Sequence, residues 1–204
     1  MVKVKICGLT SLADACAAAD AGADFLGFVF APSPRRVDPL VAHGFWPELP
    51  RGVPTVAVFR DQTLDEVERV LRLVRPDFLQ FHGCERPAFC RVFERPVIRA
   101  LPARVPADLA MADGFVDIAE FFLVDVPKGD GGTLPADVAE AAVNLPKPVL
   151  LAGGMNPANV RAIVARFRPC GVDVASGVES SPGVKDHALV RAFIDNAKNL
   201  CGSG

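Results

Sequence analysis

The chain has 204 residues, half of them apolar, and a formal net charge of −2 at pH 7. This length suits one globular domain with a sizeable core and is short for two full domains. Because lysine and arginine are spread along the chain, the charge pattern predicts no nucleic-acid surface and no basic membrane-binding face.

The cysteine and hydropathy patterns further restrict the kind of protein that this chain can be. Six cysteines fall at irregular intervals without a C-x-x-C pair, which indicates neither a zinc site nor a disulfide framework. The chain opens directly into an alternating strand, and no apolar run approaches the roughly twenty residues of a transmembrane helix. We therefore expect a cytoplasmic protein with reduced thiols, no targeting segment, and a short tail over residues 201–204.

Short apolar runs recur along the whole chain. Such runs are typical of parallel strands, which are buried on both faces. The predicted strands are Val2–Cys7, Phe25–Phe30, Thr55–Phe59, Phe78–Phe81, Val97–Ala100, Phe121–Val124, Val149–Leu151 and Val172–Ala175. Eight is the number of parallel strands that closes a barrel.

Helical patterns separate the strands. Leu12–Ala21 is alanine-rich and can be capped by Thr10 or Ser11, and Leu64–Val74 carries an apolar stripe at helical spacing. The stretch Leu101–Glu120 is interrupted by Pro102, Pro106 and Gly114. We therefore expect the fifth crossover to be short or irregular.

Two further helices are predicted near the C-terminus. Asn156 caps Ala158–Phe167, with Pro157 at the first helical position. Asp186 begins His187–Leu200, whose inward residues are predicted to be Leu189, Val190, Phe193 and Ile194.

The alternation of strand and helix defines the expected fold. The units are about twenty-five residues long and lack the glycine-rich first turn of a dinucleotide fold. We therefore predict an α/β protein, a single-domain (βα)₈ TIM barrel over residues 1–200, in preference to an open doubly wound sheet.

Glycine turns follow the last two predicted strands. Ala152-Gly153-Gly154 comes after the seventh, and Ser176-Gly177 comes after the eighth. Bare backbone N–H groups and a helix N-terminus together favour an anion, although one such turn is more often only a tight connection. Two in succession match the phosphate site that barrels build after strands seven and eight, so we expect a phosphorylated small-molecule substrate.

Catalytic groups of a barrel project from the C-terminal ends of its strands. Cys7 ends the first strand beside a glycine, where a cysteine is usually only a small buried hydrophobe. Asp125 ends the sixth, where the alternative to catalysis is a helix cap or a loop anchor. The other candidates at strand ends are Arg35, Arg36, Arg60, Asp61, Gln80, His82 and Arg99.

Two pairs among these candidates have more than one interpretation. His82 and Gln80 share one face of the fourth strand, and a lone histidine there is as often a supporting hydrogen-bonding group as an acid or base. Arg35 and Arg36 could grip a carboxylate, although arginine pairs on loops are mostly solvated.

Several motifs resemble those of the phosphoribosylanthranilate isomerase family over Lys3 to about Ala197. They are Lys5-Ile6-Cys7-Gly8, Gly22-Ala23-Asp24, Gly27-Phe28-Val29-Phe30, Ser33-Pro34-Arg35, Gln80-Phe81-His82-Gly83, Ala152-Gly153-Gly154, Asp173-Val174-Ala175-Ser176-Gly177-Val178-Glu179 and Pro182-Gly183-Val184-Lys185-Asp186.

The resemblance implies an Amadori rearrangement in tryptophan biosynthesis from chorismate, its third step, without a cofactor or metal. N-(5-phosphoribosyl)anthranilate would become 1-(2-carboxyphenylamino)-1-deoxyribulose 5-phosphate. It implies Cys7 as general base and Asp125 as general acid. The implied substrate-binding residues are Arg36 for the anthranilate carboxylate, Gly153, Gly154, Ser176 and Gly177 for the phosphate, and Gln80, His82 and Asp173.

The sixth loop departs from the family pattern. Gly129–Thr133 passes straight to Leu134-Pro135-Ala136-Asp137, without the usual second glycine and tryptophan. We expect a shortened loop with Asp137 at the start of the next helix, and its contacts with substrate stay open.

Other functions remain as alternatives. A ribulose-phosphate epimerase or indole-glycerol-phosphate synthase would share the glycine turns, but the metal ligands of the first and the lysine pair of the second are missing. A bifunctional isomerase would carry an aspartate where Cys7 stands. The competing class is a non-catalytic sugar-phosphate-binding barrel, and both monomer and homodimer are compatible with the helix faces.

Overall fold

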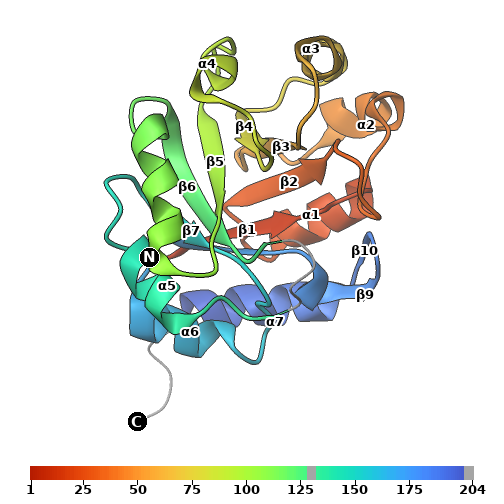
Figure 1. The fold of residues 1–204 in the computed structure, drawn as a ribbon. Helices are drawn as coiled ribbons and strands as arrows, with labels where there is room; N and C mark the ends of the chain where they lie inside the picture. The colour runs from red at the N-terminus through yellow and green to blue at the C-terminus, as the bar shows by residue number, and fades with distance from the viewer. Residues whose placement is uncertain (128–131, 200–204) are drawn as a thin grey trace.

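The computed structural model describes residues 1–127 and 132–199, and the expected tail lies outside them. Eight parallel strands pair in chain order and close into a barrel, with the helices on its outer side (Figure 1). β8 returns to β1 through the pairs Lys5 with Asp173 and Ile6 with Val174. The strands are β1 Lys3–Cys7, β2 Phe25–Val29, β3 Thr55–Phe59, β4 Phe78–Phe81, β5 Val97–Pro102, β6 Ala119–Asp125, β7 Val149–Leu151 and β8 Gly171–Val174. The predicted (βα)₈ barrel is confirmed.

Helices of varied length connect the strands. They are α1 Leu12–Asp20, α2 Pro39–Phe45, α3 Leu64–Leu73, α4 Pro87–Cys90, α5 Ala136–Ala142, α6 Val160–Phe167 and α7 His187–Lys198, with 3₁₀ helices η1 Trp46–Glu48, η2 Pro106–Phe115 and η3 Ser176–Val178. A small antiparallel hairpin, β9 Glu179–Ser181 and β10 Val184–Lys185, follows η3. The fifth crossover is irregular as predicted, because η2 replaces an α-helix there.

Local sequence signals explain several helix starts. Ser11 caps α1 by accepting a hydrogen bond from the Asp14 backbone N–H, and Asp186 accepts from the first N–H groups of α7. The predicted cap of α6 is wrong: Asn159 precedes the helix, and Asn156 instead accepts a hydrogen bond from the Ala158 N–H at 2.9 Å in the turn before it. The α-helix starts at Val160, because the residues after Asn156 first form a turn.

One inward prediction for α7 is wrong. Leu189 is 37% exposed, whereas Val190, Phe193 and Ile194 are buried. Leu189 precedes the buried stripe by one residue, and one residue turns a helix by about 100°, which carries the side chain to the rim of the face.

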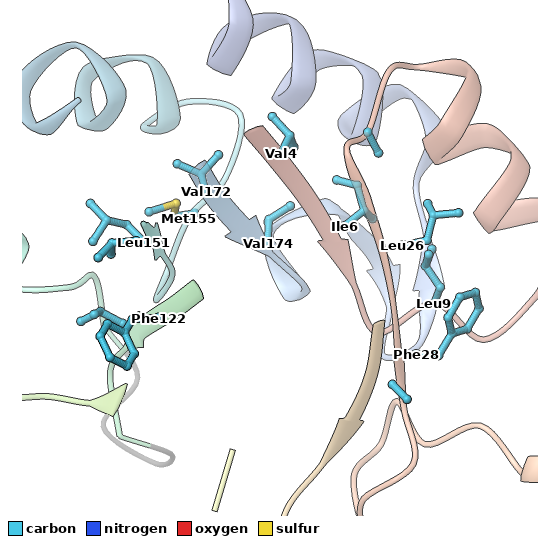
Figure 2. Close-up of a cluster of buried hydrophobic side chains, with 14 of the residues drawn as sticks. Val4, Ile6, Leu9, Leu26, Phe28, Phe122, Leu151, Met155, Val172 and Val174 are labelled. Carbon is cyan, nitrogen blue, oxygen red and sulfur yellow. The ribbon is translucent and has the colours of Figure 1, made fainter. Parts of the chain in front are cut away.

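Strand alternation separates the core into two layers. Inside the barrel, Phe25, Phe78 and Phe121 meet edge to face, with ring centroids 5.5–6.0 Å apart. The outward residues pack beneath the helices, and Figure 2 shows Val4 and Ile6 of β1 in this outer layer. Because successive strand residues face opposite sides, Lys5 and Cys7 must point into the barrel.

Candidate active site

A cavity of about 520 Å³ opens at the C-terminal ends of the barrel strands. Most of the predicted site residues line it: Cys7, Gln80, His82, Asp125, Gly153, Gly154, Asp173 and Ser176. Arg60 and Asp61, which the strand-end rule also indicated, belong to the wall as well. The fold therefore brings residues from six strands or their following turns to one mouth.

Cys7 stands at the end of β1 and is 7% exposed. Burial raises the pKa of its thiol, and the Lys5 ammonium counteracts part of that shift. The thiol nevertheless differs from an ordinary core cysteine, because it lines the cavity and has a buried ammonium on the same face of its strand.

Lys5 lies two residues before Cys7 on the same inner face and is fully buried. Its Nζ is 2.7 Å from Asp173 Oδ1 on the neighbouring strand β8. Burial alone would lower the pKa of Lys5, but the Asp173 carboxylate reverses this and raises it. The pair places a permanently charged ammonium inside the barrel.

Asp125 ends β6 across the same cavity. Burial, reinforced by the Asp173 charge, raises its pKa to about 6, although the Val126 backbone N–H and Lys5 act in the opposite direction. A carboxyl group with this pKa is partly protonated close to neutral pH, which is what a general acid needs.

His82 contacts Asp125 without forming an ion pair. Its Nε2 lies 3.6 Å from Asp125 Oδ2, and burial lowers the pKa of the imidazole to about 4. His82 is therefore neutral near pH 7, and its Nδ1 lies 3.2 Å from Gln80 Nε2. With Nδ1 accepting that hydrogen bond, the ring proton is on Nε2 and faces Asp125.

Gln80 is almost completely buried, and its Oε1 has no hydrogen-bond partner in the part of the chain that the structure describes. An unpaired buried acceptor costs about 1–3 kcal/mol. Because Gln80 lines the cavity, a bound molecule that donates a hydrogen bond would relieve that cost.

The two glycine turns lie against each other across the strand ends. Gly153 and Gly154 have φ angles of +90° and +63°, which only glycine adopts without strain. A methyl group at Gly154 would lie 2.6 Å from the Gly132 carbonyl oxygen, and one at Gly177 would collide with the Met155 carbonyl oxygen. Backbone thus packs on backbone at both turns, and neither position has room for a side chain.

The structure does not bring every candidate to the cavity. Arg36 is exposed and lines a separate cavity of about 150 Å³ between α2 and α3, while Arg35 lines the main one. Gly177 lies behind Ser176 and outside the lining. Arg99 lies outside the cavity: it is 1% exposed, stacks on Phe115 of η2 and bonds Glu85 at 2.9 Å.

The sixth loop is described only in part. Residues 128–131 lie outside the described residues, so the expected shortening of that segment is not assessed there. Gly132 lines the cavity, and Asp137 lies in the first turn of α5 as predicted, where its Oδ1 accepts from the Val138 N–H at 2.9 Å.

Sequence reasoning assigned no role to Lys5, Glu179 or Lys185. Glu179 binds Arg35 through two hydrogen bonds of 2.8 Å and also bonds Lys185 Nζ at 2.9 Å. The period-two alternation that turned Cys7 inward would have found Lys5. The Glu179 cluster gave no such signal, because Arg35 lies 144 residues before Glu179 in sequence.

Among the described residues we find neither a metal centre nor a membrane-spanning helix. Within the described ranges, no three His, Cys, Asp or Glu side chains come together in a way that could hold a metal ion. None of the helices described is both long and apolar enough to cross a membrane.

The fold and the site together define a class of protein. It is a (βα)₈ barrel enzyme in which a thiol and a carboxyl group of raised pKa line the same cavity at the barrel mouth. A family model described as N-(5'phosphoribosyl)anthranilate (PRA) isomerase matches residues 4–196. The chain belongs to the phosphoribosylanthranilate isomerase family.

Individual relatives agree with the family model. An N-(5'-phosphoribosyl)anthranilate isomerase of Geobacter metallireducens is 45% identical, covering 97% of this chain and all of the relative. The phosphoribosyl anthranilate isomerase structure from Thermus thermophilus is 38% identical, with a TM-score of 0.87, over 98% of this chain and 100% of that one. Another isomerase structure, solved with reduced 1-(o-carboxyphenylamino)-1-deoxyribulose 5-phosphate, is 36% identical, with a TM-score of 0.85 and the same coverage.

Proposed function

We propose that this isomerase converts N-(5-phosphoribosyl)anthranilate into 1-(2-carboxyphenylamino)-1-deoxyribulose 5-phosphate, a step of tryptophan biosynthesis. The observation that carries the proposal is that Cys7 and Asp125 line one cavity together with both glycine turns. The related structure that holds the reduced product analogue supports the choice of substrate.

Asp125 acts as general acid in the first step. Its carboxyl group protonates the furanose ring oxygen, the C1–O bond breaks, and the nitrogen lone pair forms a Schiff base at C1. The pKa of about 6 leaves part of the population protonated near neutral pH. The neighbouring His82 is neutral, so it adds no positive charge that would lower the pKa of Asp125.

Cys7 acts as general base in the second step. Its thiolate takes the proton from C2, and the C–H electron pair moves into the new C1–C2 double bond as the Schiff base nitrogen becomes neutral. The resulting enolamine then takes up a proton at C1 as its C2 hydroxyl loses one, which gives the ketone. No oxidant is needed, because the aldehyde carbon is reduced as the neighbouring carbon is oxidised.

Binding is assigned by chemistry and by the family pattern. The phosphate rests on the turns of Gly153, Gly154, Ser176 and Gly177, whose backbone packing favours direct N–H contact. The family pattern assigns the anthranilate carboxylate to Arg36, whose exposed side chain would have to turn out of the separate cavity between α2 and α3 to reach it. Gln80 and Asp173 face the sugar hydroxyls from the cavity floor.

A fluorescence assay that follows the loss of phosphoribosylanthranilate tests these roles. We expect Cys7→Ala and Asp125→Asn each to lower kcat by at least about 100-fold with the barrel still folded. Cys16→Ala on α1 and the exposed Asp113→Asn on η2 are the matched controls and should keep the wild-type rate.

Near-wild-type turnover in either site variant would refute the assignment of that residue. Tight binding of the phosphorylated ligand by the unmodified protein, without turnover, would instead favour the non-catalytic sugar-phosphate-binding barrel.

A further inference from the structure

Lys5 is a fully buried lysine to which the proposed chemistry gives no task. Its ammonium bonds the Asp173 carboxylate at 2.7 Å, inside the barrel and directly below the cavity. Burying two charges is expensive, and a well-packed apolar pair of similar volume would often be as stable or more stable. The position therefore calls for an explanation other than stability.

Gly27 on β2 shows what else Lys5 approaches. A methyl group at Gly27 would lie 3.0 Å from Cys7 Sγ and 3.2 Å from Lys5 Nζ. The thiol and the ammonium thus share the gap left by the missing side chain, within about the 6 Å over which an opposite charge moves a pKa. Gly27 pairs with Cys7 in the sheet, which keeps the gap beside the thiol.

We propose that Lys5 is the positioning residue for Cys7, with its ammonium holding negative charge on Cys7 Sγ across the gap above Gly27. The proposal rests on the proposed function only in taking the Cys7 thiolate as the form that matters. Lys5 transfers no proton, and it acts through Cys7 alone.

The other charges around Cys7 set the sign of each expected effect. Burial and the Asp173 carboxylate oppose the thiolate, whereas Lys5 and, from β10, Lys185 favour it. Arg35 also faces the thiol from the loop after β2. Lys5 is the cation whose removal should change the thiol most, because its ammonium adjoins the same Gly27 gap as Cys7 Sγ and favours the thiolate more strongly than Lys185 does.

The test measures the rate at which iodoacetamide alkylates Cys7, as a function of pH, by mass spectrometry of the digested protein. Lys5→Met keeps the stem and removes the charge. We expect its alkylation midpoint to lie about 1–3 pH units above that of the wild type, with at least about 10-fold slower alkylation below both midpoints.

Lys3→Met is the matched control. Lys3 shares the strand and the inner face with Lys5, but its ammonium lies over the Phe25 ring at the opposite end of the barrel. Its removal should leave the Cys7 midpoint unchanged. A Lys5→Met midpoint equal to that of Lys3→Met would overturn the proposal.

A second comparison separates the charge from the packing, since Lys5→Met alone leaves Asp173 buried without a partner. Asp173→Asn should lower the Cys7 midpoint, and adding Lys5→Met to it should raise the midpoint again. If Lys5 served only to neutralise Asp173, the two Asp173→Asn proteins would share one midpoint, and the proposal would fail. If neither Lys5 variant folds, an unmoved midpoint in Asp173→Asn overturns it.

These outcomes are independent of the isomerase assay, because alkylation needs no substrate. If the Lys5→Met midpoint is shifted but the wild-type protein does not turn over phosphoribosylanthranilate, the Lys5 role stands and the proposed function is rejected. If the wild type turns over phosphoribosylanthranilate but the Lys5→Met midpoint does not move, the proposed function stands and the Lys5 role is rejected.

Discussion

The raised pKa of Asp125, which suits a general acid, lowers the stability of the folded protein at neutral pH. Its pKa is raised from 3.8 to about 6 in the folded protein, so folding favours the protonated form. Between these two values the folded state binds the proton more tightly than the unfolded state does. The stability of the folded state therefore falls as pH rises through this window, and the loss is complete above about pH 6.

Asp125→Asn removes this loss because the amide does not titrate. We expect the variant to be more stable than the wild type by about 1–2 kcal/mol at pH 7, a value reduced for the partial exposure of the carboxyl group. At pH 4 the difference should nearly disappear. Urea unfolding at the two pH values measures it, and an equal gain at both would show that the cause is not the titration of Asp125.

Some of the site residues could be predicted from the sequence, and others could not. Cys7, His82 and Asp125 follow strands, so the barrel rule alone places them at the mouth, and the cavity contains all three. Arg36 shows the limit of that rule: consecutive loop residues point to opposite sides, and the structure turns Arg35 toward the cavity. Loop orientation depends on partners such as Glu179, which are remote in sequence.

At the scale of elements, the β9–β10 hairpin ties three loops together. The Glu179 carboxylate bonds Arg35 from the loop after β2, and Lys185 Nζ bonds the Ala175 carbonyl oxygen at 2.9 Å just before η3. Thr10 Oγ1 donates to the Gly183 carbonyl oxygen at 2.6 Å from the loop after β1. The hairpin thus fixes the turn that precedes Ser176.

Glu179→Gln should loosen this connection. The substitution leaves Lys185 and Arg35 without their carboxylate, so we expect a loss of about 2–3 kcal/mol in the free energy of unfolding. Glu140→Gln is the control, because Glu140 bonds Arg166 at the same 2.8 Å but both side chains are exposed. That change should cost less than about 1 kcal/mol. Equal losses in denaturant titrations would show that the hairpin cluster does not stabilise the fold.

The elements themselves were predictable to different degrees. β3, β4 and β7 have the predicted bounds, because each is a short apolar run between strong breakers. α2, α4 and α5 were not predicted, and each is only four to seven residues long and carries few buried positions. Such helices owe their shape to the strands that they connect more than to a periodic pattern of their own.

The whole molecule depends on a barrel interior that changes character along its axis. Phe25, Phe78 and Phe121 fill one end, whereas charged and polar side chains occupy the other. Barrel closure followed from counting eight strands, but this division did not, because it needs the register between strands that are far apart in sequence.

Phe121→Ala tests the apolar end. Its ring contacts both other phenylalanines and is 8% exposed, so we expect a loss of about 3–5 kcal/mol in unfolding free energy. Leu40→Ala on α2, which is 64% exposed, should change it by less than about 0.5 kcal/mol. Thermal and urea unfolding measure both. A small effect of Phe121→Ala would mean that the interior can collapse around the gap.

The ion pair between Lys5 and Asp173 also has a consequence for the order of assembly. Its partners are 168 residues apart, and the first strand can meet the eighth only after all the residues between them have been synthesised. Until β8 has been synthesised, Lys5 therefore stays exposed to solvent, at an edge of β1 that has no partner strand. A chain cut short before β8 would keep Cys7 and Asp125 but lose Asp173 and Ser176, so the Lys5 ammonium would have no carboxylate partner and one of the two glycine turns would be missing.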